Sequence, residues 1–180
     1  LSIIKNNLFD TICHEHLGYY STKIILKMVK KNNLKILDIK KNQINGGSTR
    51  FYICHKEASY KVKENKIKKI IEYELKFKLE NKNTYKGFFK KIINIKRKLN
   101  KKINDIKKKG KTIHGYGAST KGNVLLQFFN INKNHLDCIA DRNPLKDGCY
   151  TPGTKLPIKS EKYSRKKNPD YYLVLPWHFK

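Results

Sequence analysis

The stretch TICHEHLGYY, residues 11–20, gathers side chains that can move protons or bind a metal. Cys13 precedes two histidines, His14 and His16, which flank Glu15. In an extended segment the two histidines share one face and the glutamate lies on the other. Histidine titrates near neutral pH and a neighbouring carboxylate can orient its ring, so the pattern suits proton abstraction. A metal site and a hydrogen-bonded polar loop stay open, although the zinc-protease spacing H-E-x-x-H is absent.

A glycine turn, GYGASTKG at residues 115–122, is the second candidate site. It is not a dinucleotide fingerprint, because Thr120 stands where the third glycine belongs, and it is not a P-loop, because Lys121 precedes Gly122. The glycines still allow the backbone to approach a ligand, and Ser119 or Thr120 can cap a helix. Free N–H groups at the helix start, together with Lys121, favour an anion such as a phosphate. A strand-to-helix turn without a ligand is the alternative.

Two charged residues lie at the end of the strand that we predict over residues 136–141. Asp141 lies at a distance from the turn loosely like that of the ribose-binding acid in NAD enzymes. Arg142 is a second possible partner for a phosphate. An NAD-dependent Rossmann oxidoreductase is therefore one alternative function, disfavoured by Thr120.

The elements that must position these residues fall into two regions. In the first, apolar spacing predicts a helix over 22–33, strands over 34–40 and 48–54, and a turn at the NGG sequence 45–47. The two strands are expected to pair as an antiparallel unit. Residues 61–109 then form a lysine-rich and mostly helical region with one apolar stripe, which ends at Gly110.

From about residue 111 the pattern changes to that of a parallel α/β sheet. Residues 111–130 predict a strand, a glycine turn and a helix, and residues 136–141 predict a second strand. A loop rich in proline and glycine covers 142–158, and residues 170–177 are expected to form a further buried strand. Strands that alternate with a helix predict a parallel sheet.

Composition gives weaker signals. The formal net charge of the 180 residues is +27, but only four of the 41 basic residues are arginine, and the lysines form no single stripe. We therefore expect no nucleic-acid partner, although a basic nucleic-acid-binding protein is kept as an alternative. No apolar run of about 18 residues exists, so we expect no membrane partner. Four cysteines without a CxxC motif indicate free thiols and a cytoplasmic protein. Leu1 at the start and an apolar run at the end indicate a piece of a longer protein.

Five motifs follow one another along the chain: FDTICHEHLGYYS, NGGSTRFY, GYGASTKGN, DRNPLKDGCYTPGTKLPI and DYYLVLPWHF. In this order they resemble the carboxy-terminal half of the sugar C-methyltransferases of the NDP-hexose 3-C-methyltransferase type. These enzymes use S-adenosylmethionine (SAM) to methylate a carbon of a nucleotide-linked keto-deoxysugar. The resemblance implies an α/β fold in three parts: the end of a methyltransferase catalytic domain over 1–58, a helical linker over 59–110, and a truncated Rossmann-like nucleotide-sugar domain over 111–180.

The resemblance also implies the roles of the first motif. Its last histidine, His16, would be the general base that forms an enolate, and Glu15 would support it. Cys13 stands where the family has a tyrosine, so either the site is altered or a neighbour such as Tyr19 compensates. The turn that usually begins with histidine begins here with Asn45, whereas Arg50 keeps its place.

Substrate and cofactor follow from the same resemblance. The substrate is expected to be a dTDP-linked sugar. The SAM site and a zinc-binding module are expected upstream of this chain, and no metal is expected within it. Without these parts, the chain alone is expected to be inactive. The expected substrate-binding residues are Gly47, Ser48, Arg50, Tyr116, Gly117, Ser119, Lys121, Asn123 and Arg142.

Overall fold

The structure is a computed structural model and describes residues 1–177. Contacts within the chain divide it into two compact units. The first comprises Leu1–Phe9 and His16–Lys91, and the second comprises Asp10–Glu15 and the described residues from Ile92 onward. Within residues 1–177, each helix is too short or too polar to span a bilayer.

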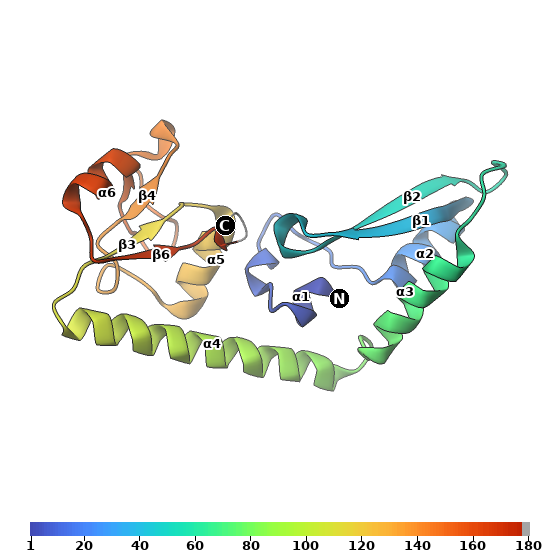
Figure 1. Cartoon of the computed structure of the whole chain (residues 1–180), viewed down its shortest axis with the longest axis horizontal. Helices are drawn as coiled ribbons and strands as arrows, with labels where there is room; N and C mark the ends of the chain where they lie inside the picture. Colours follow the sequence, from blue (N-terminus) through green and yellow to red (C-terminus); the bar gives the residue numbers. More distant parts are fainter. Residues whose placement is uncertain (178–180) are drawn as a thin grey trace. The chain divides into compact units, whose positions relative to one another are not determined.

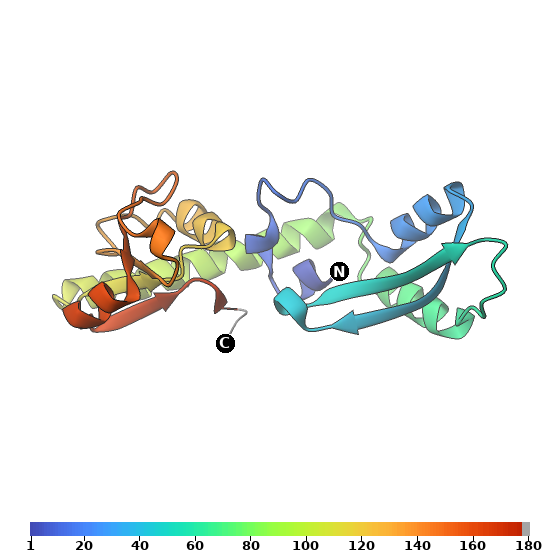
Figure 2. The ribbon, with the colours of Figure 1, turned by 90° about the horizontal axis from the view of Figure 1, so that it is seen from above.

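The first unit is built on a hairpin of two antiparallel strands, β1 (Leu34–Asn42) and β2 (Ser48–His55), which Figure 2 shows side by side. The turn between them contains Asn45 at φ 55° and two glycines with positive φ, so the sequence NGG serves the turn as predicted. Three helices belong to the same unit: α1 (Ser2–Lys5), α2 (Thr22–Lys31) and α3 (Glu64–Lys76). Residues of α2, α3 and β1 form its core: Val29, Ile36, Ile39 and Ile67.

The predicted helical region of 61–109 is divided into two helices. The helix α3 ends at Lys76 with Phe77 as its C-cap, and Lys78 has φ 49°, a left-handed conformation that does not continue a helix. The long helix α4 (Lys82–Lys108) follows (Figure 1), and Gly110 at φ 69° lies just beyond its end, as predicted. Residues of α4 up to Lys91 belong to the first unit, and the remainder belongs to the second.

The second unit contains a four-stranded sheet whose strand order is β5-β4-β3-β6, with every neighbouring pair parallel. This confirms the α/β class and the parallel sheet. Its helix α5 joins β3 to β4, and α6 joins β5 to β6 (Figure 1). The bounds of these elements are β3 Ile113–Tyr116, α5 Thr120–Phe129, β4 Ile139–Asp141, β5 Ile158–Ser160, α6 Glu161–Lys167 and β6 Tyr171–Val174.

Two details of this sheet differ from the predictions. The strand expected to be buried over 170–177 is the exposed strand β6: Tyr171 is 47% exposed and Tyr172 is 42% exposed. The reason is its position, because among the described strands β6 pairs with β3 only and so forms an edge of the sheet. The predicted loop of 142–158 also contains a short helical turn, Pro144–Lys146, and the first residue of β5.

Candidate active site

The glycines after β3 serve close packing within the second unit. A Cβ atom on Gly117 would lie 2.6 Å from Cδ of Pro176, and the residue has φ 86°. A Cβ atom on Gly115 would collide with the side chain of Ile139. The space beside both glycines is therefore filled by the protein's own side chains, which explains the glycines without a ligand at these points.

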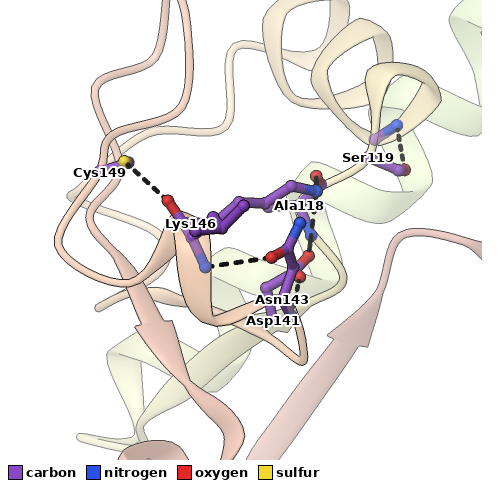
Figure 3. Close-up of polar contacts among 8 residues, drawn as sticks. Ala118, Ser119, Asp141, Asn143, Lys146 and Cys149 are labelled. Atoms are coloured by element: carbon purple, nitrogen blue, oxygen red, sulfur yellow. Dashed lines mark hydrogen bonds and ion pairs between the residues drawn. The ribbon is translucent and has the colours of Figure 1, made fainter.

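The loop after Gly117 is held by hydrogen bonds on both sides (Figure 3). The backbone N–H of Ala118 donates to Oδ2 of Asp141 at 2.7 Å, and Nζ of Lys146 donates to the Ala118 carbonyl at 2.7 Å. The other oxygen of Asp141 accepts from the backbone N–H of Asn143 at 2.8 Å. Both carboxylate oxygens of Asp141 thus position the chain, a role different from the ribose binding that the NAD alternative requires.

Ser119 is the N-cap of α5, as the sequence allowed. Its backbone is extended, and its hydroxyl oxygen accepts from the N–H of Gly122 at 3.0 Å (Figure 3). Lys121 is half-buried in the first turn of this helix. Thr120, also in this turn, donates its hydroxyl to Oε1 of Glu15 at 3.1 Å. The carboxylate of Glu15 therefore lies beside the N-terminal end of α5, where the helix dipole favours negative charge.

The segment that carries Glu15 is bent. The prediction of an extended segment is wrong for residues 13–15, which form a bend and a turn. One anchor of the segment is buried: Asp10 is 2% exposed, and its Oδ2 accepts from Nε1 of Trp177 at 3.0 Å. This buried hydrogen bond and the contact between Glu15 and Thr120 hold the two ends of the segment to the second unit.

A cavity of about 820 Å³ lies between this segment and α5. Its walls bring together Cys13 and Glu15, proposed from the first motif, and Asn123, proposed from the third. His14 and Thr120, which were also named from the sequence, line the cavity too, whereas the sequence did not single out Ile12, Val124, Gln127, Phe128 or Pro152. The full lining is Ile12, Cys13, His14, Glu15, Thr120, Asn123, Val124, Gln127, Phe128 and Pro152.

The two histidines of the motif differ in their surroundings. The side chain of His14 is 84% exposed, and its Nε2 lies 4.0 Å from Oε1 of Glu15. His16 is also exposed and belongs to the first unit by its contacts. Over residues 1–177, no group of three or more histidine, cysteine, aspartate or glutamate side chains is arranged to hold a metal ion.

A second cavity of the same unit, about 390 Å³, lies at the carboxyl ends of β3, β4 and β6. We call it the Arg142 crevice; its lining is Tyr116, Gly117, Ala140, Asp141, Arg142, Glu161, Val174 and Pro176. In open parallel sheets ligands bind at this edge, where the strand order reverses. The order β5-β4-β3-β6 reverses between β3 and β6, the strands that lead into Gly117 and Pro176.

The polar wall of the Arg142 crevice is a three-residue network. Oε1 of Glu161 accepts from the hydroxyl of Tyr116 and from Nε of Arg142, the latter at 2.8 Å. The hydrogen bonds from Tyr116 and Arg142 lower the pKa of Glu161, and the bond to Glu161 raises the pKa of Tyr116. The side chain of Arg142 is 79% exposed, so its outer nitrogens face solvent. A fixed guanidinium with an exposed end can bind a phosphate.

Three predicted substrate residues lie in the first unit. Gly47 has φ 132° in the hairpin turn, and the hydroxyl of Ser48 donates to the carbonyl of Ile44 at 3.0 Å. Arg50 is exposed on β2, and its hydrogen bond lowers the pKa of Tyr52. Of these three residues, Gly47 and Ser48 shape the turn, and Arg50 is the one that carries a charge.

Glu161 is a site residue that sequence reasoning missed. It follows Ser160, whose hydroxyl oxygen accepts from the N–H of Tyr163 and caps α6. A serine followed by a glutamate is a recognisable helix start, so this signal was present in the sequence. Lys146, which holds the glycine loop, carried no comparable local signal.

Comparison with known proteins identifies the family of the chain. Residues 43–180 match the family model described as C-methyltransferase C-terminal domain. Over 179 residues the chain is 28% identical to the C-methyltransferase NovU of Streptomyces niveus, an alignment that covers 99% of this chain and 42% of the relative. The chain thus spans less than half the length of that curated relative. Because the family model matches most of the chain, the family inferred from the motifs is confirmed: this chain belongs to the C-methyltransferases and carries their C-terminal domain.

Proposed function

We propose that the chain is the carboxy-terminal part of a SAM-dependent enzyme that methylates a carbon of a nucleotide-linked keto-deoxysugar, with dTDP as the nucleotide. One observation carries the proposal. The cavity beside α5 joins Glu15 of the first motif to Thr120 and Asn123 of the third, 105 or more residues away. Two motifs that the family resemblance assigned to one substrate therefore line one cavity.

The proposed chemistry begins with a proton on the carbon next to the ketone. His16 removes this proton as general base, and the electron pair of the C–H bond moves into the enolate. Glu15 keeps the polar groups of the motif in place through its bond to Thr120. SAM, when bound, supplies the methyl group. We assign SAM and the zinc module to segments outside this chain, so the chain alone should not methylate.

The nucleotide end of the substrate is proposed to lie at the glycine turn. Arg142 and Tyr116 in the Arg142 crevice, with Lys121 at the start of α5, bind the diphosphate, and Ser119 shapes the turn. Gly47, Ser48 and Arg50 contact the substrate from the first unit, as the family motif implies. We place the enzyme in the cytoplasm, in keeping with its four free cysteines.

Calorimetry on the whole 180-residue chain tests this proposal. Thymidine diphosphate, NAD and a mixed-sequence DNA duplex are titrated separately at physiological salt. We expect saturable binding of thymidine diphosphate, weakened about tenfold by Lys121→Ala because a charged contact to phosphate is lost. Lys133→Ala removes the same charge from an exposed loop position and should leave the affinity unchanged.

The other titrations decide against the proposal. Tight, salt-dependent DNA binding with no binding of thymidine diphosphate would favour the nucleic-acid alternative. Preference for NAD over thymidine diphosphate would favour the oxidoreductase alternative.

A further inference from the structure

The cavity beside α5 and the Arg142 crevice differ in the charged groups that they offer to a ligand. The crevice contains the guanidinium of Arg142 and two carboxylates, of which Asp141 is paired with Lys146 and Glu161 with Arg142 itself, whereas no lysine or arginine is among the lining residues of the cavity. This is unexpected in a chain with 41 basic residues. The cavity presents the carboxylate of Glu15 and the amide of Asn123, with apolar surface from Ile12, Val124 and Phe128. A phosphate would meet the negative charge of Glu15 here, so the cavity suits an uncharged ligand that has both hydroxyl and apolar groups.

Asn123 is the residue of this wall that lacks a partner. Its Oδ1 atom is buried and accepts no hydrogen bond from any of residues 1–177. Asn100 also has a buried and unpaired Oδ1, but its Nδ2 donates to the carbonyl of Phe129 at 2.9 Å, which gives that side chain a structural role. Asn123 has no such bond. A buried acceptor without a donor is destabilising, so its presence calls for a donor from elsewhere.

The position of Asn123 on α5 directs it to the cavity. Thr120, Asn123 and Gln127 are spaced three and four residues apart, so they lie on one face of the helix, and all three line the cavity. Thr120 is committed to Glu15, and Gln127 donates its Nε2 to the carbonyl of Pro152 at 3.2 Å. On this face the two neighbours of Asn123 are therefore occupied, whereas Oδ1 of Asn123 between them has no donor among residues 1–177.

We propose that Asn123 determines specificity by accepting a hydrogen bond from a hydroxyl of the sugar. The cavity beside α5 then holds the sugar, and the Arg142 crevice holds a phosphate. The loop Gly117–Thr120 connects the two sites, because Gly117 lines the crevice and Thr120 lines the cavity. This inference rests on the proposed function and adds to it the division of the substrate between the two sites.

The test compares two probes on the full chain by calorimetry: thymidine diphosphate, which has no hexose, and thymidine diphosphate–glucose. The wild-type chain should bind the sugar-bearing probe more tightly. In Asn123→Leu, which keeps the size of the side chain without its polar atoms, that advantage should fall about tenfold, as expected for one lost hydrogen bond to a ligand hydroxyl. Binding of thymidine diphosphate itself should stay within about twofold of the wild type.

A matched control and a stability measurement separate this role from a structural one. Asn134→Leu makes the same change at an exposed position and should alter neither affinity. Without ligand, Asn123→Leu should raise the melting temperature, because an unpaired buried acceptor has been replaced by an apolar group. A lowered melting temperature would show that Asn123 has an internal structural partner and would overturn the inference.

The binding outcomes are also distinguishable. If the chain binds thymidine diphosphate but Asn123→Leu keeps the full advantage of the sugar-bearing probe, the inference fails and the proposed function stands. The same conclusion follows if the wild-type chain binds the two probes equally. If the chain binds neither probe, both the inference and the proposed function fail.

Discussion

The two halves of the motif GYGASTKGN have different environments in the structure. In the first half, Gly117 packs against Pro176, and both backbone polar groups of Ala118 are hydrogen-bonded within the second unit. In the second half, Thr120 contacts Glu15 and Asn123 faces a cavity without a partner. The sequence resemblance assigned one role, binding of the substrate, to residues of both halves.

This difference indicates how one short sequence motif can combine two tasks. Residues whose polar groups are satisfied inside the protein shape the loop, and residues whose polar groups are unsatisfied face the ligand. Substitutions in the first half should therefore reduce stability, whereas substitutions in the second half should change binding. The following predictions test this division.

The largest effect is expected at Gly117. Replacement by alanine forces a positive φ on a residue with a Cβ atom and brings that atom against the ring of Pro176, so we expect a loss of about 3 kcal/mol in the free energy of unfolding. Gly148 is the matched control, since it has φ 83° but nothing within 4 Å of its Cβ position. Gly148→Ala should cost only about 1 kcal/mol. Urea unfolding followed by fluorescence of Trp177, the single tryptophan, measures both; equal losses would contradict the packing argument.

A somewhat smaller loss in the free energy of unfolding is expected at Asp141, one of the two side chains that hydrogen-bond to the backbone of Ala118. Asp141→Asn removes the negative charge that accepts from two backbone N–H groups and faces Lys146, and should lower the free energy of unfolding by about 2 kcal/mol. The same change at the exposed Asp105 on α4 should alter it by less than about 0.5 kcal/mol. If Asp141→Asn were as mild as the control and instead weakened NAD binding, the ribose-binding alternative would return.

A third prediction extends the comparison to a fully partnered carboxylate of the first unit. Hydrogen bonds from Lys66 and Lys63 lower the pKa of Asp38 from 3.8 to about 2, against the opposing effect of burial. A lowered folded-state pKa means that the stabilisation is complete above about pH 4 and is lost as the pH falls towards 2. Circular dichroism melts between pH 5 and pH 2 should show this loss in the wild type. In Asp38→Asn the stability should be lower at pH 5 and should change less on acidification.

The smallest effect is expected for the contact between Glu15 and Thr120. Both groups are partly exposed, so a double-mutant cycle with Glu15→Gln and Thr120→Val should give a coupling energy of about 0.5 kcal/mol. Chemical denaturation of the four proteins provides the measurement. A coupling energy above about 2 kcal/mol would mean that Glu15 is part of the structural half of the site.

Local patterns were enough to predict much of the fold. The helix α2, the hairpin of β1 and β2, and the strand–turn–helix of β3 and α5 each depend on apolar spacing and turn residues within a few positions of one another. The short elements β5 and α6 were missed, because a strand of three residues and a mostly polar helix of seven residues give too weak a periodic signal. The exposure of β6 could not be predicted either, since it depends on which strands lie beside it.

The site was predicted in part for a related reason. The sequence identified Glu15 and Asn123 separately, from motifs, but their common cavity depends on contacts between residues more than 100 positions apart. The hydrogen bonds between the backbone of Ala118 and the side chains of Asp141 and Lys146 likewise join residues that are far apart in the sequence. Such contacts arise from tertiary packing, so the periodic pattern of apolar residues in a single sequence does not reveal them.

The hydrogen bond between Asp10 and Trp177 has a consequence for biosynthesis. The two residues are 167 positions apart, so the segment around Cys13 and Glu15 leaves the ribosome long before its partners exist. At about 5–20 residues per second, roughly 10–30 s pass before Trp177 is made. During this interval the thiol and the carboxylate of the motif cannot be covered by the second unit. Completion of that unit therefore comes long after the first motif is made, and Trp177 is needed before the buried hydrogen bond that anchors the segment of Cys13 and Glu15 can form.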